Sequence, residues 1–253
     1  MQLDHIEYQS VPIRPVECLK EAKALIGEQY WLFVGISTVG LLIAGAAPFY
    51  ILLGPMMCGI FLCFQDRIHG KRTTFERLFK GFDYFVETLI ATLIVGGLTA
   101  VVIVPLYVGV ILSAIGMSDD DALPVLLPIM FGLLIVILLV IMLVSSLFIF
   151  AYPLICFGGL KAMPAIKTSC RAALANFPGV LGLVLLTNLI WMSAGMCCVV
   201  PAYLVAPILI GSALMAYRKV FPDGFVNEQP LDASVLPDEG KPTPQPSKPN
   251  DFA

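Results

Sequence analysis

The residues that could carry chemistry in this chain are few and widely separated. Only two histidines are present, and one of them, His69, lies in the sequence Asp66-Arg67-Ile68-His69-Gly70. A carboxylate and an imidazole this close could form an acid–base pair, but a turn with a basic rim is the simpler interpretation. The zinc-protease motif HExxH, the hydrolase motif GxSxG and the glycine-rich phosphate loops are absent from the sequence. We therefore predict a protein that is not an enzyme, with no catalytic residue and no cofactor.

Two polar residues stand at or inside long apolar stretches, where such residues often mark function. Glu87 precedes the stretch 88–118, and we expect an interfacial carboxylate near Lys80, with an ion or proton site as the alternative. Asn188 lies inside the stretch 172–217, next to Thr187. We expect an interhelical hydrogen bond from Asn188, worth roughly 1 kcal/mol in a membrane, with a substrate contact as the alternative.

Neither cysteines nor carboxylates have the spacing of a metal site. The seven cysteines are Cys18, Cys58, Cys63, Cys156, Cys170, Cys197 and Cys198. They form no CxxC pair, so we expect them to act as small packing residues, with redox activity of the adjacent Cys197 and Cys198 as the alternative. The run Asp119-Asp120-Asp121 lacks the spaced ligands and glycine turn of a calcium loop. It predicts a solvated turn, with weak divalent-cation binding as the alternative, and no metal site is predicted.

The composition indicates that lipid surrounds much of the chain. Hydrophobic residues make up 58% and charged residues 13% of the sequence, and the mean hydropathy is +0.91. Soluble domains are nearer half apolar and a quarter charged, so this chain has too few charges to cover a water-facing surface. The net charge of −3 gives no basic excess for binding nucleic acid.

The apolar stretches predict an all-α, polytopic transmembrane bundle with about six spans. Segments 29–65, 88–118, 122–160 and 172–217 contain no Asp, Glu, Lys or Arg, and a spanning helix needs about 20 apolar residues. The first and last stretches fit two helices each, because each has glycine and proline at its centre. Their uniformly apolar character excludes barrel strands, which alternate apolar and polar residues. The predicted spans lie near 31–47, 49–66, 86–112, 126–152, 177–195 and 200–218.

The basic residues predict the orientation of the chain. All fifteen Lys and Arg residues fall within 14–23, 66–81, 158–176 and 218–248. The alternate loops, near 47 and at 113–125 and 195–200, carry none. Because basic residues concentrate in cytoplasmic loops, we expect both termini in the cytoplasm.

Segments outside the spans predict the domain organisation. Amphipathic stretches at 15–28, 73–87 and 163–176 are expected to lie as helices in the headgroup plane. The second of these has Thr73 and Glu76 spaced as a capping box. We predict a flexible arm over 1–14, a transmembrane domain over 15–220 and a disordered, proline-rich cytoplasmic tail over 221–253.

Two helical hairpins share spaced residues and suggest an internal duplication. Lys20, Gly35, Pro55, Gly59 and Arg67 mark the first hairpin, and Lys167, Gly182, Pro207, Gly211 and Lys219 mark the second. Both copies begin on the same predicted side of the membrane, so the repeat is parallel. Parallel repeats also occur in carriers, so the repeat does not itself decide the function.

These motifs resemble those of a family of uncharacterised bacterial integral membrane proteins. The resemblance covers roughly residues 15–220 and rests on Gly35, Pro55-x-x-x-Gly59, Leu78-Phe79-Lys80-Gly81-Phe82, and the second hairpin with Pro201, Pro207 and Gly211. The family is similar to the membrane domain of glycerophosphoryl diester phosphodiesterases. The resemblance implies a six-helix fold without catalytic residues, because the catalytic domain of those enzymes has no counterpart here.

The function predicted from these features is association with membrane lipids, or with another membrane protein, as a non-enzymatic accessory or scaffold of the cell inner membrane. Candidate anionic-lipid contacts, at roughly 1 kcal/mol each, are Arg67, Lys71, Arg72, Arg77 and Lys80. The alternative is a transporter or channel for a neutral or amphipathic solute, which predicts a polar cavity near Asn188, Thr99 and Tyr203. A membrane-embedded enzyme is a third hypothesis. The sequence leaves the substrate, the partner and the oligomeric state open.

Overall fold

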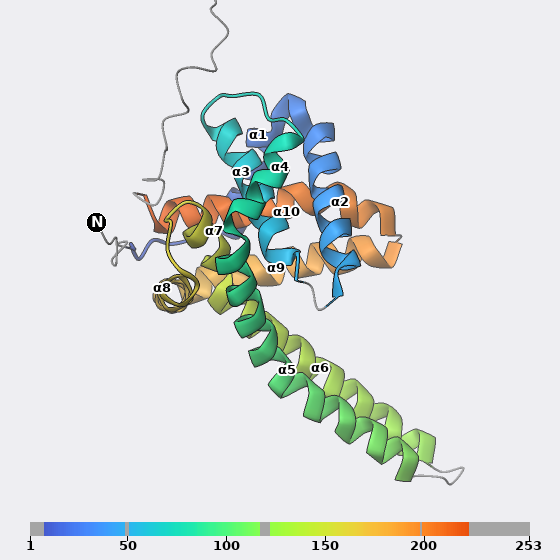
Figure 1. The fold of residues 1–253 in the computed structure, drawn as a ribbon. Coiled ribbons are helices and arrows are strands. Elements are labelled where there is room, and N and C mark those ends of the chain that lie inside the picture. Colours follow the sequence, from blue (N-terminus) through green and yellow to red (C-terminus); the bar gives the residue numbers. More distant parts are fainter. Residues whose placement is uncertain (1–7, 49–50, 117–121, 198, 223–253) are drawn as a thin grey trace, which may run out of the picture.

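The computed structural model describes residues 8–48, 51–116, 122–197 and 199–222, in which all regular structure is helical (Figure 1). The longer helices are α1 (Pro15–Ile26), α2 (Tyr30–Ala46), α3 (Leu53–Ile68), α5 (Phe85–Gly116), α6 (Ala122–Phe148), α8 (Ala162–Ala175), α9 (Phe177–Cys197) and α10 (Val199–Val220). The shorter ones are η1 (Gly27–Gln29), α4 (Glu76–Phe79), η3 (Lys80–Tyr84) and α7 (Ala151–Cys156). The predicted all-α fold is confirmed.

Five helical segments of the described chain are long and apolar enough to cross a membrane. They are Pro15–Ala46, Glu76–Gly109, Pro128–Cys156, Phe177–Met196 and Val200–Val220. Lengths of this order suit the hydrocarbon core of a bilayer, which is about 30 Å thick. The five segments correspond to five of the six predicted spans and are those of a membrane protein.

The remaining predicted span, 49–66, corresponds to α3 and is shorter than the others. Its 16 residues reach about 24 Å, less than the thickness of the hydrocarbon core. Nearly every residue from Gly54 to Gln65 is buried, because α2, α4, η3, α5 and α7 all pack around α3. A helix enclosed in this way is shielded from lipid by protein.

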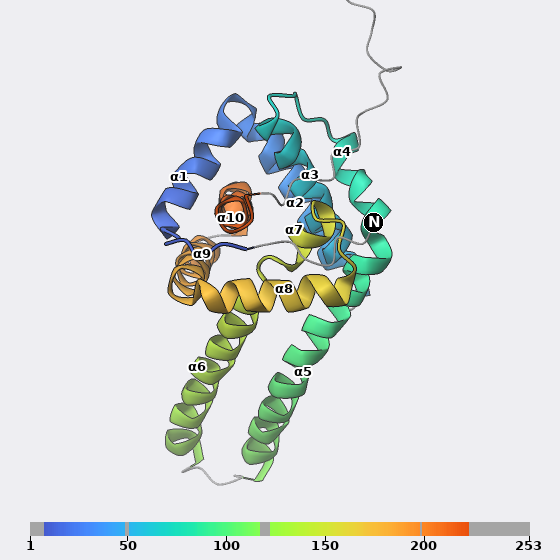
Figure 2. The same cartoon turned by 90° about the vertical axis from the view of Figure 1, so that its left-hand side faces the viewer.

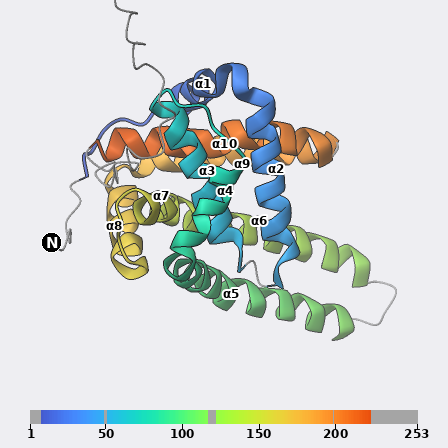
Figure 3. The same cartoon turned by 45° about the horizontal axis from the view of Figure 1, so that its top comes forward.

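The helices form three pairs that point in different directions. These pairs are α2 with α3, α5 with α6, and α9 with α10. α9 and α10 lie side by side and run crosswise to α2, while α5 and α6 extend together away from the rest (Figures 1 and 3). In Figure 2, α8 lies across the base of the α5–α6 hairpin. Since α2 and α10 run crosswise, one of these helices must be strongly tilted if the other stands along the bilayer normal.

The two motifs that carry the family resemblance meet at the centre of the fold. A Cβ atom on Gly59 would overlap the carbonyl oxygen of Leu78, and one on Gly81 would overlap the carbonyl oxygen of Pro55. The Pro55-x-x-x-Gly59 motif of α3 therefore packs backbone against backbone on the segment Leu78–Phe82. Glycine is required at both positions because the approach leaves no room for a side chain.

This contact interrupts the amphipathic helix expected over 73–87. The chain forms α4, tightens into the 3-10 helix η3 where Gly81 meets α3, and resumes as α5. The predicted capping box is wrong. Thr73 is buried, and its hydroxyl donates to the carbonyl oxygen of Cys63 at 3.0 Å, whereas α4 begins at Glu76 without a side-chain cap.

Part of the predicted N-terminal arm is bound to the rest of the protein. The Val11 amide donates to Oδ1 of the buried Asn176 at 2.8 Å, and Nδ2 of Asn176 donates to the Gln9 carbonyl at 3.2 Å. The Gln9 amide donates to the Val220 carbonyl at 2.9 Å. Ile13 is buried against Gly179. The segment before α1 thus links the start of α9 to the end of α10.

A disulfide joins Cys58 of α3 to Cys156 at the end of α7. The expectation that the cysteines serve only for packing is therefore wrong for this pair. The bond closes a loop of 98 residues that contains α4, η3 and the whole α5–α6 hairpin. Cys18 and Cys63 are buried as free thiols and Cys170 is partly buried. The side chains of Cys197 and Cys198 lie outside the described residues.

Candidate functional site

Two of the five predicted lipid-contacting cations are engaged within the protein. The Nε–H of Arg67 donates to the Leu25 carbonyl at 3.0 Å, near the C-terminus of α1, where a cation also complements the helix dipole. Nε of Arg77 lies 3.2 Å from the carboxylate of Asp66 in an ion pair, although the angle is not that of a hydrogen bond. The carboxylate of Asp66 therefore faces a guanidinium, and the pair closes the loop between α3 and α4.

The other three predicted cations are available for binding. Lys71, Arg72 and Lys80 are exposed, and none of their side chains forms an ion pair or hydrogen bond within the part of the chain that the structure describes. Three phenylalanines of the same segment, two between Arg72 and Lys80 and one after Lys80, are also exposed. Phe75, Phe79 and Phe82 have exposed fractions of 41%, 49% and 39%. We call these six residues the basic–aromatic loop.

Glu87 has a partner that its sequence context did not indicate. Its carboxylate Oε2 accepts a hydrogen bond from the backbone N–H of Ala162 at 2.7 Å. Ala162 is the first residue of α8, so the carboxylate stands at the positive end of that helix. Glu87 therefore fastens the start of α5 to the start of α8.

Asn188 does not form the interhelical hydrogen bond predicted for it. Its Nδ2 donates to the carbonyl of Val184 in its own helix at 2.8 Å, and Thr187 donates to the Leu183 carbonyl at 2.9 Å. Since neither side chain bonds to a neighbouring helix in the described structure, Oδ1 of Asn188 remains able to accept a hydrogen bond from another molecule.

Asn188 lines a cavity between the two hairpins, which we call the asparagine pocket. Its volume is about 320 Å³, at the lower end of the roughly 300–1,000 Å³ of ligand pockets. Polar contributions come from Ser145, Thr187, Asn188 and Trp191, and the remaining walls are apolar side chains of α2, α3, α6, α9 and α10. A hollow is thus present near Asn188, but it is mostly apolar and not the polar cavity predicted, and Thr99 and Tyr203 are not among its lining residues.

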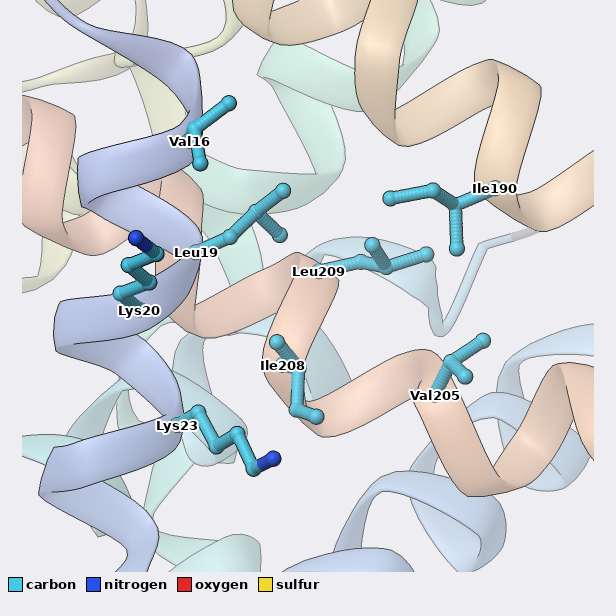
Figure 4. A pocket seen from close by; sticks show the side chains of 8 residues that line it. All are labelled: Val16, Leu19, Lys20, Lys23, Ile190, Val205, Ile208 and Leu209. Atoms are coloured by element: carbon cyan, nitrogen blue, oxygen red, sulfur yellow. The ribbon is translucent and has the colours of Figure 1, made fainter.

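A second hollow, the lysine pocket, has a volume of about 230 Å³ and lies between α1, α9 and α10 (Figure 4). The α1 side consists of Val16, Leu19, Lys20 and Lys23. The opposite side consists of Ile190 from α9 and of Val205, Ile208 and Leu209 from α10. The pocket is therefore almost entirely apolar, and Lys20 and Lys23, one helical turn apart on α1, line its edge mainly with their aliphatic stems.

The sequence comparison decides the family of this chain. The sequence model of DUF7847, described as a domain of unknown function, matches residues 27–249. The chain belongs to this family. No curated protein and no solved structure matches it, so the resemblance to the membrane domain of glycerophosphoryl diester phosphodiesterases stays a prediction. The DUF7847 match begins after α1, so the lysine pocket is built partly from residues outside the matched range.

Sequence reasoning missed the lysine pocket because its two walls come from distant segments of the chain. Cys18, Ala22 and Ile26 form the buried face of α1. Their spacing of four residues is helical, and this signal was present in the sequence. The partner of that face, α10, lies too far along the chain to be inferred from local periodicity.

The contacts in the structure do not support two further hypotheses from the sequence, the acid–base pair of Asp66 with His69 and a metal site. Asp66 pairs with Arg77, so the proposed acid–base pairing with His69 has a competing partner. No group of three or more His, Cys, Asp or Glu side chains able to hold a metal ion occurs within the described residues. The run Asp119-Asp120-Asp121 lies outside those residues.

Proposed function

We propose that this DUF7847 protein is a non-enzymatic accessory or scaffold protein of the cell inner membrane that acts by associating with anionic lipid. The observation that carries the proposal is the basic–aromatic loop. Lys71, Arg72 and Lys80 are exposed without ion-pair partners in the described structure, beside three exposed phenylalanines. Cations at a membrane surface attract anionic headgroups, and phenylalanine on the apolar face of an interfacial segment is buried at the boundary between headgroups and acyl chains.

The exposed aromatic side chains distinguish this proposal from a role in orientation alone. A loop that only fixes the topology needs its positive charges but has no use for exposed rings. Phe79, half exposed next to Lys80, adds apolar area that the interface can bury. The loop therefore combines the two kinds of contact that a headgroup layer offers.

The test measures which lipids border the protein. The full chain is reconstituted in phosphatidylcholine vesicles, and the relative association of spin-labelled phosphatidylglycerol and phosphatidylcholine is measured by electron paramagnetic resonance. We expect the ratio of phosphatidylglycerol to phosphatidylcholine association to fall toward one in the triple variant Lys71→Gln, Arg72→Gln, Lys80→Gln. The matched control removes Lys161, Lys167 and Arg171, three exposed cations of the α8 region, and should keep the preference. An unchanged preference in the loop variant would reject the proposal.

The orientation belongs to the same proposal, with both termini in the cytoplasm and residues 119–121 on the other side. Reporter fusions at residue 120 and after residue 253 should give opposite compartments, because the cations share one side of the membrane. Equal reporter signals from the two fusions would overturn this orientation and with it the cytoplasmic placement of the loop.

A second candidate function, transport of a neutral amphipathic solute, is favoured by the asparagine pocket. The pocket touches both hairpins and contains no charged side chain, so it suits an uncharged molecule with one polar group. A fluorescent diacylglycerol analogue in proteoliposomes is a suitable probe, because chemical quenching from outside reports its movement between leaflets. Transport predicts faster movement with the protein than without it, and slowing by Asn188→Leu. Equal rates in protein-free vesicles would exclude this candidate for that lipid class.

A further inference from the structure

We propose that the lysine pocket binds one anionic phospholipid, whose phosphate is bound by the side chains of Lys20 and Lys23 at the edge of the pocket and whose acyl chain lies against α9 and α10. This inference rests on the proposed lipid association and adds a defined site to it, on a different helix from the basic–aromatic loop. The site is distinguished from general attraction to the bilayer by its charge, shape and position.

The charges on α1 leave its two lysines in need of an anion. Glu17 is bound by Arg14 at 2.8 Å, and Glu21 is bound by Lys219 at 2.8 Å. The carboxylates of α1 are thus already paired with other cations. The side chains of Lys20 and Lys23 form neither an ion pair nor a hydrogen bond in the described part of the chain. Two adjacent cations favour a ligand that carries negative charge, and a phosphate can accept hydrogen bonds from both.

The position of α1 makes this unpaired charge unusual. Ala22 packs against Gly211 in the middle of α10: a Cβ atom placed on Gly211 would lie 3.1 Å from the Cβ atom of Ala22. Just after α1, the hydroxyl of Tyr30 donates to the Leu204 carbonyl of α10 at 2.8 Å. α1 therefore packs across the middle of the apolar helix α10 (Figures 2 and 4). Cations at such a place extend toward an interface or pair with an anion.

The shape of the pocket suits part of a lipid and not a whole soluble ligand. Its volume of about 230 Å³ falls below the roughly 300–1,000 Å³ of pockets that enclose a small molecule. Apart from the lysines its lining is aliphatic, and Figure 4 shows these side chains facing one another across the hollow. A lipid needs only one chain segment in such a groove, because its remainder stays in the surrounding bilayer.

The experiment counts lipids bound to the full chain. The protein is purified in a mild detergent, stripped of lipid and titrated with phosphatidylglycerol, phosphatidylcholine of the same chains, or oleate, with native mass spectrometry as the readout. We expect one phosphatidylglycerol to bind in preference to phosphatidylcholine. Lys20→Gln with Lys23→Gln should weaken this binding roughly 30-fold, because each cation near an anionic headgroup contributes about fivefold. Lys161→Gln with Lys167→Gln removes two exposed cations from α8 and should leave the affinity unchanged.

A second variant tests the chain-binding part of the site without changing any charge. Val205→Trp fills the groove between α9 and α10 and should also weaken phosphatidylglycerol binding. Its control, Val101→Trp, alters a 72% exposed residue of α5 and should have no effect. Normal binding by Val205→Trp would overturn the placement of the acyl chain.

The outcomes separate this inference from the proposed function. If the lysine variant binds phosphatidylglycerol normally while the loop variant loses its boundary-lipid preference, the site is rejected and the proposed function stands. If the lysine variant loses the bound lipid while the loop variant keeps its preference, the pocket stands and the loop is rejected. Equal binding of phosphatidylcholine, or lysine-dependent binding of oleate tighter than that of phosphatidylglycerol, would overturn the assignment to an anionic phospholipid.

Discussion

The α5–α6 hairpin and the body of helices around α3 differ in what covers their apolar side chains. In the two hairpin spans, Glu76–Gly109 and Pro128–Cys156, the most apolar windows have mean hydropathies of 2.5 and 3.3, and only 11% of their residues are buried inside the protein. In α10 the hydropathy is lower, at 1.7, yet 56% of the window is buried. The hairpin therefore leaves its highly apolar side chains to be covered by lipid, whereas the protein itself covers most of α10.

The glycines of the two regions show the same difference. Gly96, Gly97, Gly109 and Gly132 of the hairpin would each place a Cβ in open space. Gly59, Gly81 and Gly211 of the body would each place it against a neighbouring helix or side chain. Glycine in the body permits close packing of backbones, whereas in the hairpin it leaves a gap for lipid.

Within the described residues, the hydrogen bonds that join the hairpin to the body lie near the base of the hairpin. The Thr92 and Tyr152 hydroxyls lie 3.1 Å apart, Glu87 binds the start of α8, and the Cys58–Cys156 disulfide closes the loop that contains the hairpin. The hairpin can therefore lose contacts near its tip at little cost, while changes in the body or at the base should destabilise the fold.

The largest effect is expected where the two sequence motifs meet. Gly81→Ala places a methyl group on the carbonyl of Pro55, and a backbone atom cannot rotate away as a side chain can. We expect a loss of about 3 kcal/mol or more, the upper end of overpacking costs, seen as a sharply lower thermal midpoint in detergent. The control Gly96→Ala, in α5, should leave the midpoint unchanged or slightly higher. Equal midpoints for the two variants would break the contrast between body and hairpin.

The disulfide should have the next largest effect. Replacing Cys58 and Cys156 together by Ser releases a loop of 98 residues, and bonds that close long loops typically stabilise by about 2–4 kcal/mol. The thermal midpoint should fall, and the mass difference between reduced and oxidised wild-type protein should disappear in the variant. Replacing Cys63, a buried free thiol, by Ser serves as the control for disulfide content. A wild-type protein without the mass difference would show that the bond does not form in the cell.

The attachment at Glu87 should contribute less. Glu87→Ala removes a charge-assisted hydrogen bond to the N-terminus of α8, for which we expect a loss of about 1–2 kcal/mol. Glu87→Gln keeps an acceptor oxygen and should lose less. The exposed Asp83, which has no ion-pair or hydrogen-bond partner in the described structure, provides the control Asp83→Ala. Thermal midpoints that fall equally for Glu87→Ala and Asp83→Ala would show that the contact with α8 adds no stability.

The sequence predicted the elements of both regions but not how they are joined. The apolar run near 31–47 corresponds to α2 at Tyr30–Ala46, and 177–195 to α9 at Phe177–Cys197, because long apolar segments in lipid must satisfy their backbone bonds as helices. Periodicity did not predict the break at Gly81, since that break arises from contact with α3. It also did not predict the pairing of Cys58 with Cys156, which are brought together only by the fold.

The candidate sites were less predictable for the same reason. The basic residues of the 66–81 loop were found by their charge, but only the structure shows that Arg67 and Arg77 are occupied while Lys71, Arg72 and Lys80 are exposed. Lys20 and Lys23 were not predicted as a binding site from the sequence, because the apolar wall opposite them comes from α9 and α10. Sites formed between distant segments leave no local pattern.

The smallest effect is expected near the middle of the hairpin. Leu139 of α6 is 60% exposed. In the variant Leu139→Ala, lipid can fill the space that the leucine side chain leaves. Since lipid tails are as apolar as leucine, we expect a change in thermal midpoint within experimental error. Phe64→Ala, at a fully buried ring of α3 packed on Phe33 with centroids 4.7 Å apart, should cost about 3–5 kcal/mol. A clear loss from Leu139→Ala would mean that protein covers this face, and comparing the cross-linked oligomers of that variant and the wild type would then show whether a second copy does.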